Sequence, residues 1–314
     1  MVQQGIDTKK VEERQAPSVA VVEPTPEAIE RTSEIADAAL KELEKPAVGP
    51  PFTPQSPAQI TKWVKGLFYG DPGVGKTFLL GTAMKFAPTR PVLLLDSEAG
   101  TMSIRDTGVD VVAVRSYEEV GQIAKWLKEN NFARVGADGK IVPGQRYQTL
   151  CIDSLSELQR HVMRGILTAA VRKDPEHDPD IAEQRDWLKN AERVRKLVRG
   201  VRDLDIHVLF TCLARERQDE RTGAVTIKPH LPGQLADEVS GFLDFAGYMR
   251  IGTVEDEDND AEGKRKKVLI RRVYFQPAGH FLAKDRSGVL PVYLDNPTIE
   301  AIVGPIVNEG GNKQ

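Results

Sequence analysis

From about Thr61 onward, the chain alternates short, continuously apolar runs with longer segments whose apolar residues recur at helical spacing. Continuous apolar runs are typical of strands buried on both faces, and helical spacing is typical of helices that cover a sheet. Because parallel strands need crossover connections, this alternation predicts an α/β fold with a mainly parallel central sheet and helices on both faces. The predicted strands are KGLFYG, PVLLLD, VDVVAV, QTLCID and DIHVLFTCLA, and the predicted helices include KTFLLGTAMKFA, SYEEVGQIAKWLKEN and SLSELQRHVMRGILTAAV.

Two later apolar segments predict an edge of a different kind. LDFAGYMRI and KKVLIRRVYF flank the acidic stretch EDEDNDAEG, which we expect to be an exposed hairpin connection. This late pair of strands would extend the sheet antiparallel at one edge.

One further, long helix is predicted between about residues 181 and 203. Its cationic residues are typical of a helix side that faces solvent or another subunit. The residues expected on its buried face are Trp187, Ala191, Val194, Val198 and Val201, and the cations are Arg185, Lys189, Arg193, Arg195, Lys196, Arg199 and Arg202.

The first 57 residues lack the strand–helix alternation. They hold eight of the 20 prolines and almost no aromatic residues, so they cannot bury enough apolar surface to offset the entropy of ordering. We therefore expect a disordered tail over 1–57, an ordered core over 58–303 and a flexible C-terminus over 304–314. Residues 27–45 of the tail favour a short amphipathic helix, either a nascent helix or a docking helix for a protein partner.

Composition and charge restrict the classes of function. The formal net charge is −3, so any polyanion would have to bind at a local basic patch. Cys151 and Cys212 lie in separate apolar runs, which indicates buried thiols in a reducing compartment rather than a disulfide framework or a metal site. No stretch approaches the roughly 20 apolar residues of a membrane span, and no signal peptide follows Met1. We expect a cytoplasmic protein that does not bind membranes.

A glycine-rich turn follows the first predicted strand and matches G-x-x-x-x-G-K-[ST] at every fixed position. Glycines permit the backbone angles that turn successive N–H groups toward phosphate oxygens, and the N-terminus of the next helix adds further N–H groups. We expect Lys76 to reach the β- and γ-phosphates of ATP and the Thr77 hydroxyl to ligate Mg²⁺. The expected nucleotide-binding residues are Gly70, Asp71, Pro72, Gly73, Val74, Gly75, Lys76, Thr77 and Phe78.

Carboxylates end two of the other predicted strands. TLCID ends at Asp153, where a carboxylate would lie near the magnesium of the nucleotide. LLLDSEAG carries Asp96 and Glu98, one of which is placed to polarise the attacking water. The alternatives are a helix cap at Asp153 and a solvated loop for the second pair of acids.

With these motifs, the chain resembles the RecA-like branch of P-loop ATPases over roughly residues 61–292. It is most similar to the phage nucleotide-binding proteins with a recombinase core that support single-strand annealing. In RecA a strand ends in Asp-x-Glu and its glutamate activates water, so the resemblance assigns this catalytic role to Glu98 of DSE, with Asp96 as a supporting acid. The RecA metal-side strand ends in Asp-Ser, as CIDSL does at Asp153. RecA has a glutamine that senses the γ-phosphate at the end of the next strand. This chain departs from the RecA pattern there and has Thr211 at about that place, and its hydroxyl can hydrogen-bond phosphate or water.

FLAKDRSG resembles the Lys-x-Arg motif of the hexameric DnaB-type helicases and of KaiC. The resemblance implies that Lys284 and Arg286 reach the γ-phosphate of a neighbouring subunit and neutralise transition-state charge. The active site would then form only between the protomers of a filament or a ring. The alternative is a basic surface turn.

RecA-type proteins hold single-stranded DNA through the loops after the metal-side helix and after the sensor strand. The equivalents in this chain are RKDPEHDPD and ARERQDERTGAVTIKPHLPGQ. The second segment also contains acids, and it has no aromatic residue on which a base could stack. DNA contact and a plain solvated hairpin therefore both stay open. The candidate phosphate contacts are Arg215, Arg217, Arg221 and Lys228.

The sequence as a whole favours an Mg²⁺-dependent, self-assembling, RecA-like ATPase that acts on single-stranded DNA in phage recombination or replication. One alternative is an ATP-dependent interaction switch that uses the N-terminal tail as a docking arm and does not bind DNA. Another is a helicase-like ring motor, supported only by the Lys-x-Arg motif.

Overall fold

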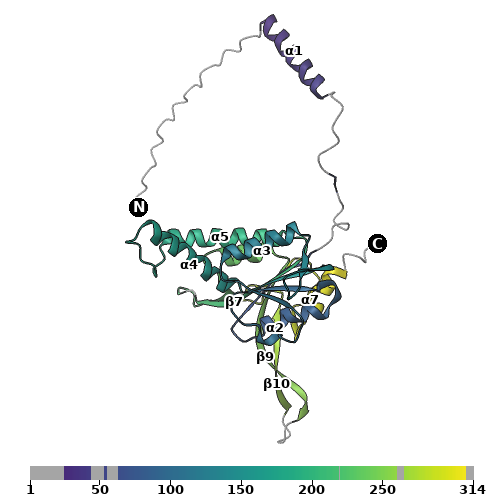
Figure 1. Ribbon diagram of the computed structural model, residues 1–314, viewed down its shortest axis with the longest axis vertical. Coiled ribbons are helices and arrows are strands. Elements are labelled where there is room, and N and C mark those ends of the chain that lie inside the picture. The colour runs from purple at the N-terminus through teal and green to yellow at the C-terminus, as the bar shows by residue number, and fades with distance from the viewer. Residues whose placement is uncertain (1–24, 44–52, 55–62, 219, 260–264, 309–314) are drawn as a thin grey trace, which may run out of the picture. The chain divides into compact units, whose positions relative to one another are not determined.

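The computed structural model describes residues 25–43, 53–54, 63–218, 220–259 and 265–308 (Figure 1). The chain divides into two compact units, residues 1–57 and 58–314. In the first unit, helix α1 spans Pro26–Leu43, close to the helix predicted over residues 27–45. The rest of the predicted disordered tail lies outside the described residues, apart from residues 25, 53 and 54.

The second unit is built on one large sheet with the strand order β12-β10-β9-β1-β7-β6-β2-β3. Its central strands pair in parallel, which confirms the predicted α/β class. These strands are β1 (Lys65–Gly70), β2 (Val92–Asp96), β3 (Asp110–Ala113), β6 (Thr149–Asp153), β7 (His207–Gln218) and β9 (Phe245–Asn259).

The predicted antiparallel edge is also present. Strand β10 (Arg265–Tyr274) pairs antiparallel with β9, and β12 (Tyr293–Asp295) pairs antiparallel with β10. Strand β9 is longer than predicted, because it continues through most of the acidic stretch expected to form a loop, whereas β10 matches the predicted segment to within one residue. Residues 260–264, which complete this connection, lie outside the described residues.

Helices cover both faces of the sheet, with α3, α4 and α5 on one side and α2 and α7 on the other (Figure 1). The alternation of side chains in β1 serves both layers, since Leu67 and Tyr69 join the core under α3–α6 and Phe68 joins the core under α2 and α7. The helices are α2 (Lys76–Gly81), α3 (Tyr117–Glu129), α4 (Leu155–Lys173), α5 (Gln184–Arg202), α6 (Leu235–Phe242) and α7 (Ile299–Asn308).

Several elements differ from the predicted pattern. The helix expected over residues 76–87 ends at Gly81 and continues as two 3₁₀ segments, Thr82–Lys85 and Ala87–Thr89. A third, Thr101–Ile104, packs against it so closely that a Cβ on Gly81 would lie 2.5 Å from the Ile104 side chain.

Helix α7 continues past residue 303, and its Ile306 is buried. The expected start of the flexible C-terminus therefore falls inside this helix. Four other short strands have too weak an apolar pattern to be predicted from the sequence. The additional strands are β4 (Ala133–Val135), β5 (Ile141–Arg146), β8 (Val225–Pro229) and β11 (Lys284–Asp285).

Both cysteines are buried and unpaired, as the sequence indicated. Burial is the main cause that raises the pKa of the Cys212 thiol to about 11. Among the described helices, none is long and apolar enough to cross a membrane.

Candidate active site

The glycine-rich turn connects the end of β1 to the start of α2, and its backbone needs glycine at three positions. Gly73 and Gly75 have φ angles of 79° and 94°, in the left-handed region that disfavours other residues. Gly70 lies so close to β9 that a Cβ would stand 2.1 Å from the Met249 carbonyl oxygen. The turn is thus a cradle of main-chain groups whose shape fits the triphosphate of a nucleotide.

Lys76, the first residue of α2, folds back over this loop. Its Nζ donates to the carbonyl oxygens of Gly70 and Asp71, at 3.0 and 2.9 Å. The residue is only 7% exposed, and burial lowers the pKa of the amine, while nearby Glu98 and Asp153 act in the opposite direction. The amine is therefore held at the loop by two carbonyls whose place phosphate oxygens can take.

Asp153 receives a hydroxyl group on each of its carboxylate oxygens. Thr77 Oγ1 donates to Asp153 Oδ2 at 2.6 Å, and Thr211 Oγ1 donates to Asp153 Oδ1. The carboxylate is 3% exposed, at the end of β6. A hydroxyl beside a carboxylate is the hard-oxygen donor set that Mg²⁺ prefers, so the residues fit a metal at the position predicted from the sequence.

Glu98 follows β2 and lies in the same cluster. The registers of β2 and β6 place Asp96 beside Asp153. The turn after β2 is tied to the turn after β6, because Ser97 N donates to the Asp153 carbonyl at 2.8 Å and Ser154 Oγ donates to Glu98 Oε1.

Asp96 supports this turn, since its buried Oδ1 accepts from the Glu98 N–H at 2.9 Å. Glu98 itself is exposed to solvent, as a group that activates water must be. The structure therefore brings together the residues predicted for the phosphates, the metal and the water at the carboxyl ends of adjacent strands.

Lys284 and Arg286 lie at the other end of the sheet. Lys284 pairs with Ala246 of β9 through β11, and Ala246 pairs with Leu67 of β1. The phosphate-binding loop begins at Gly70, about 10 Å further along the strand at roughly 3.3 Å per residue. Arg286 lies further away still, because its N–H donates to the carbonyl of Asp244, before the start of β9. These two cations are therefore far from the loop of their own chain.

Within the chain, both cations bind the end of α6. Lys284 Nζ donates to the carbonyl oxygens of Ser240, Gly241 and Leu243, each at 3.0 Å. Arg286 donates to the Gly241 carbonyl at 2.7 Å and remains exposed. Cations at this position satisfy the unpaired carbonyl groups of a helix C-terminus. Lys284 is occupied by this cap, whereas Arg286 keeps most of its donors available.

The candidate DNA residues lie on a hairpin formed by β7 and β8, where a loop or a plain hairpin was expected. Arg215 and Arg217 are exposed and two residues apart on β7, so they share a face. Lys228 pairs with Arg215 across the hairpin, and its Nζ binds both oxygens of Asp237, at 2.8 and 2.9 Å. Arg221 lies in the turn between the two strands.

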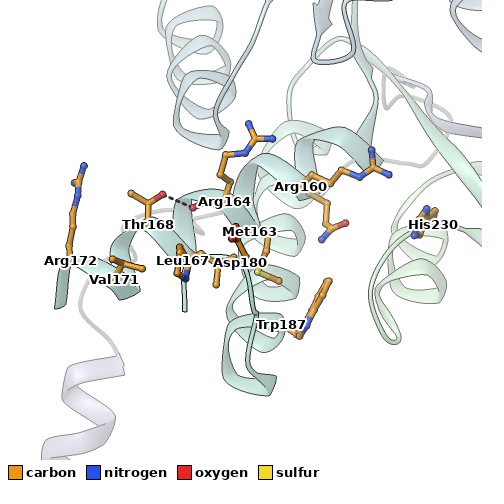
Figure 2. Close-up of a pocket in the computed structure, with 12 residues that line it drawn as sticks. Arg160, Met163, Arg164, Leu167, Thr168, Val171, Arg172, Asp180, Trp187 and His230 are labelled. Atoms are coloured by element: carbon orange, nitrogen blue, oxygen red, sulfur yellow. Dashed lines mark hydrogen bonds between the residues drawn. The ribbon is translucent and has the colours of Figure 1, made fainter. Parts of the chain in front are cut away.

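Sequence reasoning missed a basic groove between α4 and α5, which Figure 2 shows. The groove encloses about 720 Å³, and its arginines lie along α4. Trp187 of α5, predicted to be buried, is 45% exposed and contributes an aromatic face. The (i, i+4) spacing of Arg160 and Arg164 is visible in the sequence and is the signal that could have located this face of the helix. The lining of the groove includes Arg160, Arg164, Arg172, Trp187 and His230.

His230 connects this groove to the β7–β8 hairpin. Partial burial is the main cause that lowers the pKa of its imidazole, and Arg215, Arg160 and Arg217 lower it further. The cations of α4 and of β7 therefore both lie near this imidazole.

A short chain of contacts leads from His230 to the metal side. Ser156 Oγ donates to the His230 carbonyl at 3.5 Å, accepts from the Leu213 N–H at 2.9 Å and contacts Cys212 Sγ at 3.1 Å. Cys212 follows Thr211, which binds Asp153.

Comparison with known proteins gives one family. A model of the AAA domain family matches residues 62–287. No curated protein matches the chain. Among solved structures, the chain is similar to a prototypical ATPase from the type III secretion system of pathogenic bacteria, with 15% identity and a TM-score of 0.35 over 60% of this chain and 52% of that one. The chain thus spans about half the length of that protein.

Proposed function

The chain belongs to the AAA domain family and is an ATP-hydrolysing P-loop enzyme, and from this premise we propose that it acts on single-stranded DNA as a self-assembling, Mg²⁺-dependent ATPase. The role in phage recombination or replication is the one that the resemblance to recombinase-core proteins implies. The observation that carries the DNA proposal is the basic groove with an exposed indole along α4, the helix that follows Asp153 in the chain.

At the phosphate end of the site, the main-chain groups of residues 70–77 bind the triphosphate. Lys76 exchanges the Gly70 and Asp71 carbonyls for phosphate oxygens. Thr77 and Asp153 would hold Mg²⁺, which neutralises charge on the phosphate oxygens. Thr211 orients the carboxylate through its hydrogen bond to Asp153.

Glu98 takes a proton from the attacking water. Its Oε1 is held by the Ser154 hydroxyl, so the carboxylate keeps a fixed direction while it remains open to solvent. A positioned general base contributes about 10²- to 10⁴-fold to the rate.

Arg286 completes the site of a neighbouring protomer, and Lys284, held by the carbonyl groups at the end of α6, positions the turn that carries it. Their distance along β1 from their own loop supports action in trans. A head-to-tail contact between protomers is heterologous and yields a ring or a filament, depending on whether the rotation closes.

Single-stranded DNA lies in the groove between α4 and α5. Arg160, Arg164 and Arg172 provide cations for successive phosphates, and Trp187 supplies the stacking surface that the β7–β8 hairpin lacks. The hydrogen bonds around Ser156 provide a physical connection from this groove to Thr211 and Asp153.

A binding titration tests the groove. We expect Arg164→Gln to weaken single-stranded DNA binding and to lower its salt dependence, because one phosphate contact is lost. Trp187→Ala should weaken binding about 5- to 100-fold with an unchanged salt dependence, because stacking is worth about 1–3 kcal/mol per base.

Lys125→Gln is the matched control, since it removes one charge from an α3 residue whose side chain is 75% exposed outside this groove. Wild-type DNA affinity in both groove variants would contradict this assignment. An ATP turnover rate that is the same with and without single-stranded DNA would favour the interaction switch.

A further inference from the structure

We propose that Arg271 of β10 and Phe78 of α2 form the subsite for the base of the bound nucleotide. This inference rests on nucleotide binding at the loop of residues 70–77. The Arg271 side chain passes directly over the loop, since a Cβ built on Gly75 would lie 2.5 Å from Arg271 Nε and 2.8 Å from its Cδ. Its guanidinium carbon lies 5.2 Å from the centroid of the Phe78 ring.

The backbone of Arg271 is fixed while its head group is accessible. Its N–H donates to Asn296 Oδ1 at 3.0 Å, and its carbonyl accepts from the Asn296 N–H at 2.6 Å. The next residue, Arg272, is anchored by Asp295 through Nε and Nη2. Within the described part of the chain, no carboxylate pairs with the Arg271 guanidinium, which stays exposed. A fixed strand thus presents a free planar cation beside the loop.

The chemistry of the pair fits a nucleobase. The loop and Lys76 serve the phosphates, with the lysine directed to the β and γ positions, so the nucleoside leaves the loop at the α-phosphate. Phe78 follows Thr77 directly and is 46% exposed, a large apolar ring left open beside a phosphate site. A phenyl ring and a guanidinium plane both stack on bases. Because every base has a π-face, stacking of this kind discriminates little between purines.

Paired affinities for two ligands test the subsite. We would measure the Kd of inorganic tripolyphosphate and of an ATP analogue with a non-hydrolysable β–γ bond, each with Mg²⁺. Arg271→Ala and Phe78→Leu should each weaken the ATP analogue about tenfold, or about 1.4 kcal/mol, and should leave tripolyphosphate within about twofold of wild type. The corresponding GTP analogue should lose affinity to the same extent.

Arg250→Ala is the matched control. Arg250 is an exposed arginine of β9 whose register partner is Arg272, so it lies on the opposite face of the sheet from Arg271. Equal losses for tripolyphosphate and the ATP analogue would overturn the proposal and make Arg271 a phosphate ligand. Unchanged affinity for the ATP analogue in both variants would also overturn it. If the wild-type protein binds neither ligand, the failure lies in the loop assignment rather than in the base subsite.

Discussion

Asp153 divides its two carboxylate oxygens between hydroxyl groups from different elements, Thr77 of α2 and Thr211 of β7. Both bonds hold the carboxylate in one orientation, and Thr77 is itself an expected metal ligand. The site is therefore organised before any ligand binds, and less free energy is needed to order it on binding.

Glu98 offers the sharpest test of catalysis at the residue scale. Glu98→Gln keeps an oxygen that can accept from the Ser154 hydroxyl, so the geometry and ATP affinity should be retained. Because an amide cannot take the proton, the turnover number should fall about 10²- to 10⁴-fold. Steady-state turnover and equilibrium ATP binding, measured on the same preparation, would check this.

Glu118→Gln in the first turn of α3 is the corresponding control, because that side chain is exposed. Unchanged hydrolysis in Glu98→Gln would remove Glu98 from the mechanism.

At the residue scale, the sequence places candidate residues in the site where the signal is local. Gly70, Lys76 and Thr77 follow from one contiguous motif, and Asp153 follows from the end of one apolar run. Arg271 carries no such signal, because it meets Gly75 only through the long-range registers that place β9 next to β1 and β10 next to β9. A contact made across three strands cannot be seen in either segment alone.

At the scale of elements, apolar patterning was sufficient for the central strands and the larger helices. Helix α3 is capped by a local serine of the kind that sequence can reveal, with Ser116 Oγ accepting from the Glu119 N–H at 3.2 Å. The prediction that Trp187 is buried was wrong, since the residue is 45% exposed. Helical periodicity shows which residues share one face of a helix, but it does not show how much of that face the neighbouring helix covers. The β7–β8 hairpin was left open because the part of β7 beyond its predicted apolar run is charged and polar (RERQ), and β8 is a short strand of five residues.

The end of α6 bears on catalysis through Arg286. Arg286→Ala removes one bond to a helix end that Lys284 still caps, so the melting temperature should change little. Turnover should be lost, because the neighbouring site lacks its cation. Mixing this variant with Lys76→Ala should partly restore turnover, since some interfaces then combine an intact loop with an intact Arg286.

The rescue must be read with both variants shown to be folded and assembled. Under those conditions, a mixture no more active than its components would argue against action in trans. Full activity of Arg286→Ala alone would leave the residue only as a cap of α6.

At the scale of the whole molecule, the parallel sheet gathers the chemistry at one edge. Strands β1, β2 and β6 end there, and β7 passes the same edge at Thr211 before it continues into the β7–β8 hairpin. The loop, Glu98, Asp153 and Thr211 are therefore brought together. Helix α4 starts at the same edge, directly after Asp153, and continues along the basic groove. Occupation of the groove and hydrolysis at the loop are therefore expected to influence each other through α4 and β7.

ATP turnover, with and without single-stranded DNA at a low and a high salt concentration, tests this account most directly. We predict Mg²⁺-dependent hydrolysis that rises when single-stranded DNA is added, with a stimulation that declines steeply as salt increases, because the groove neutralises phosphates and releases counterions. Hydrolysis that is identical with and without DNA at both salt concentrations would contradict the proposed action on DNA, and the absence of any hydrolysis would contradict the account of the active site itself.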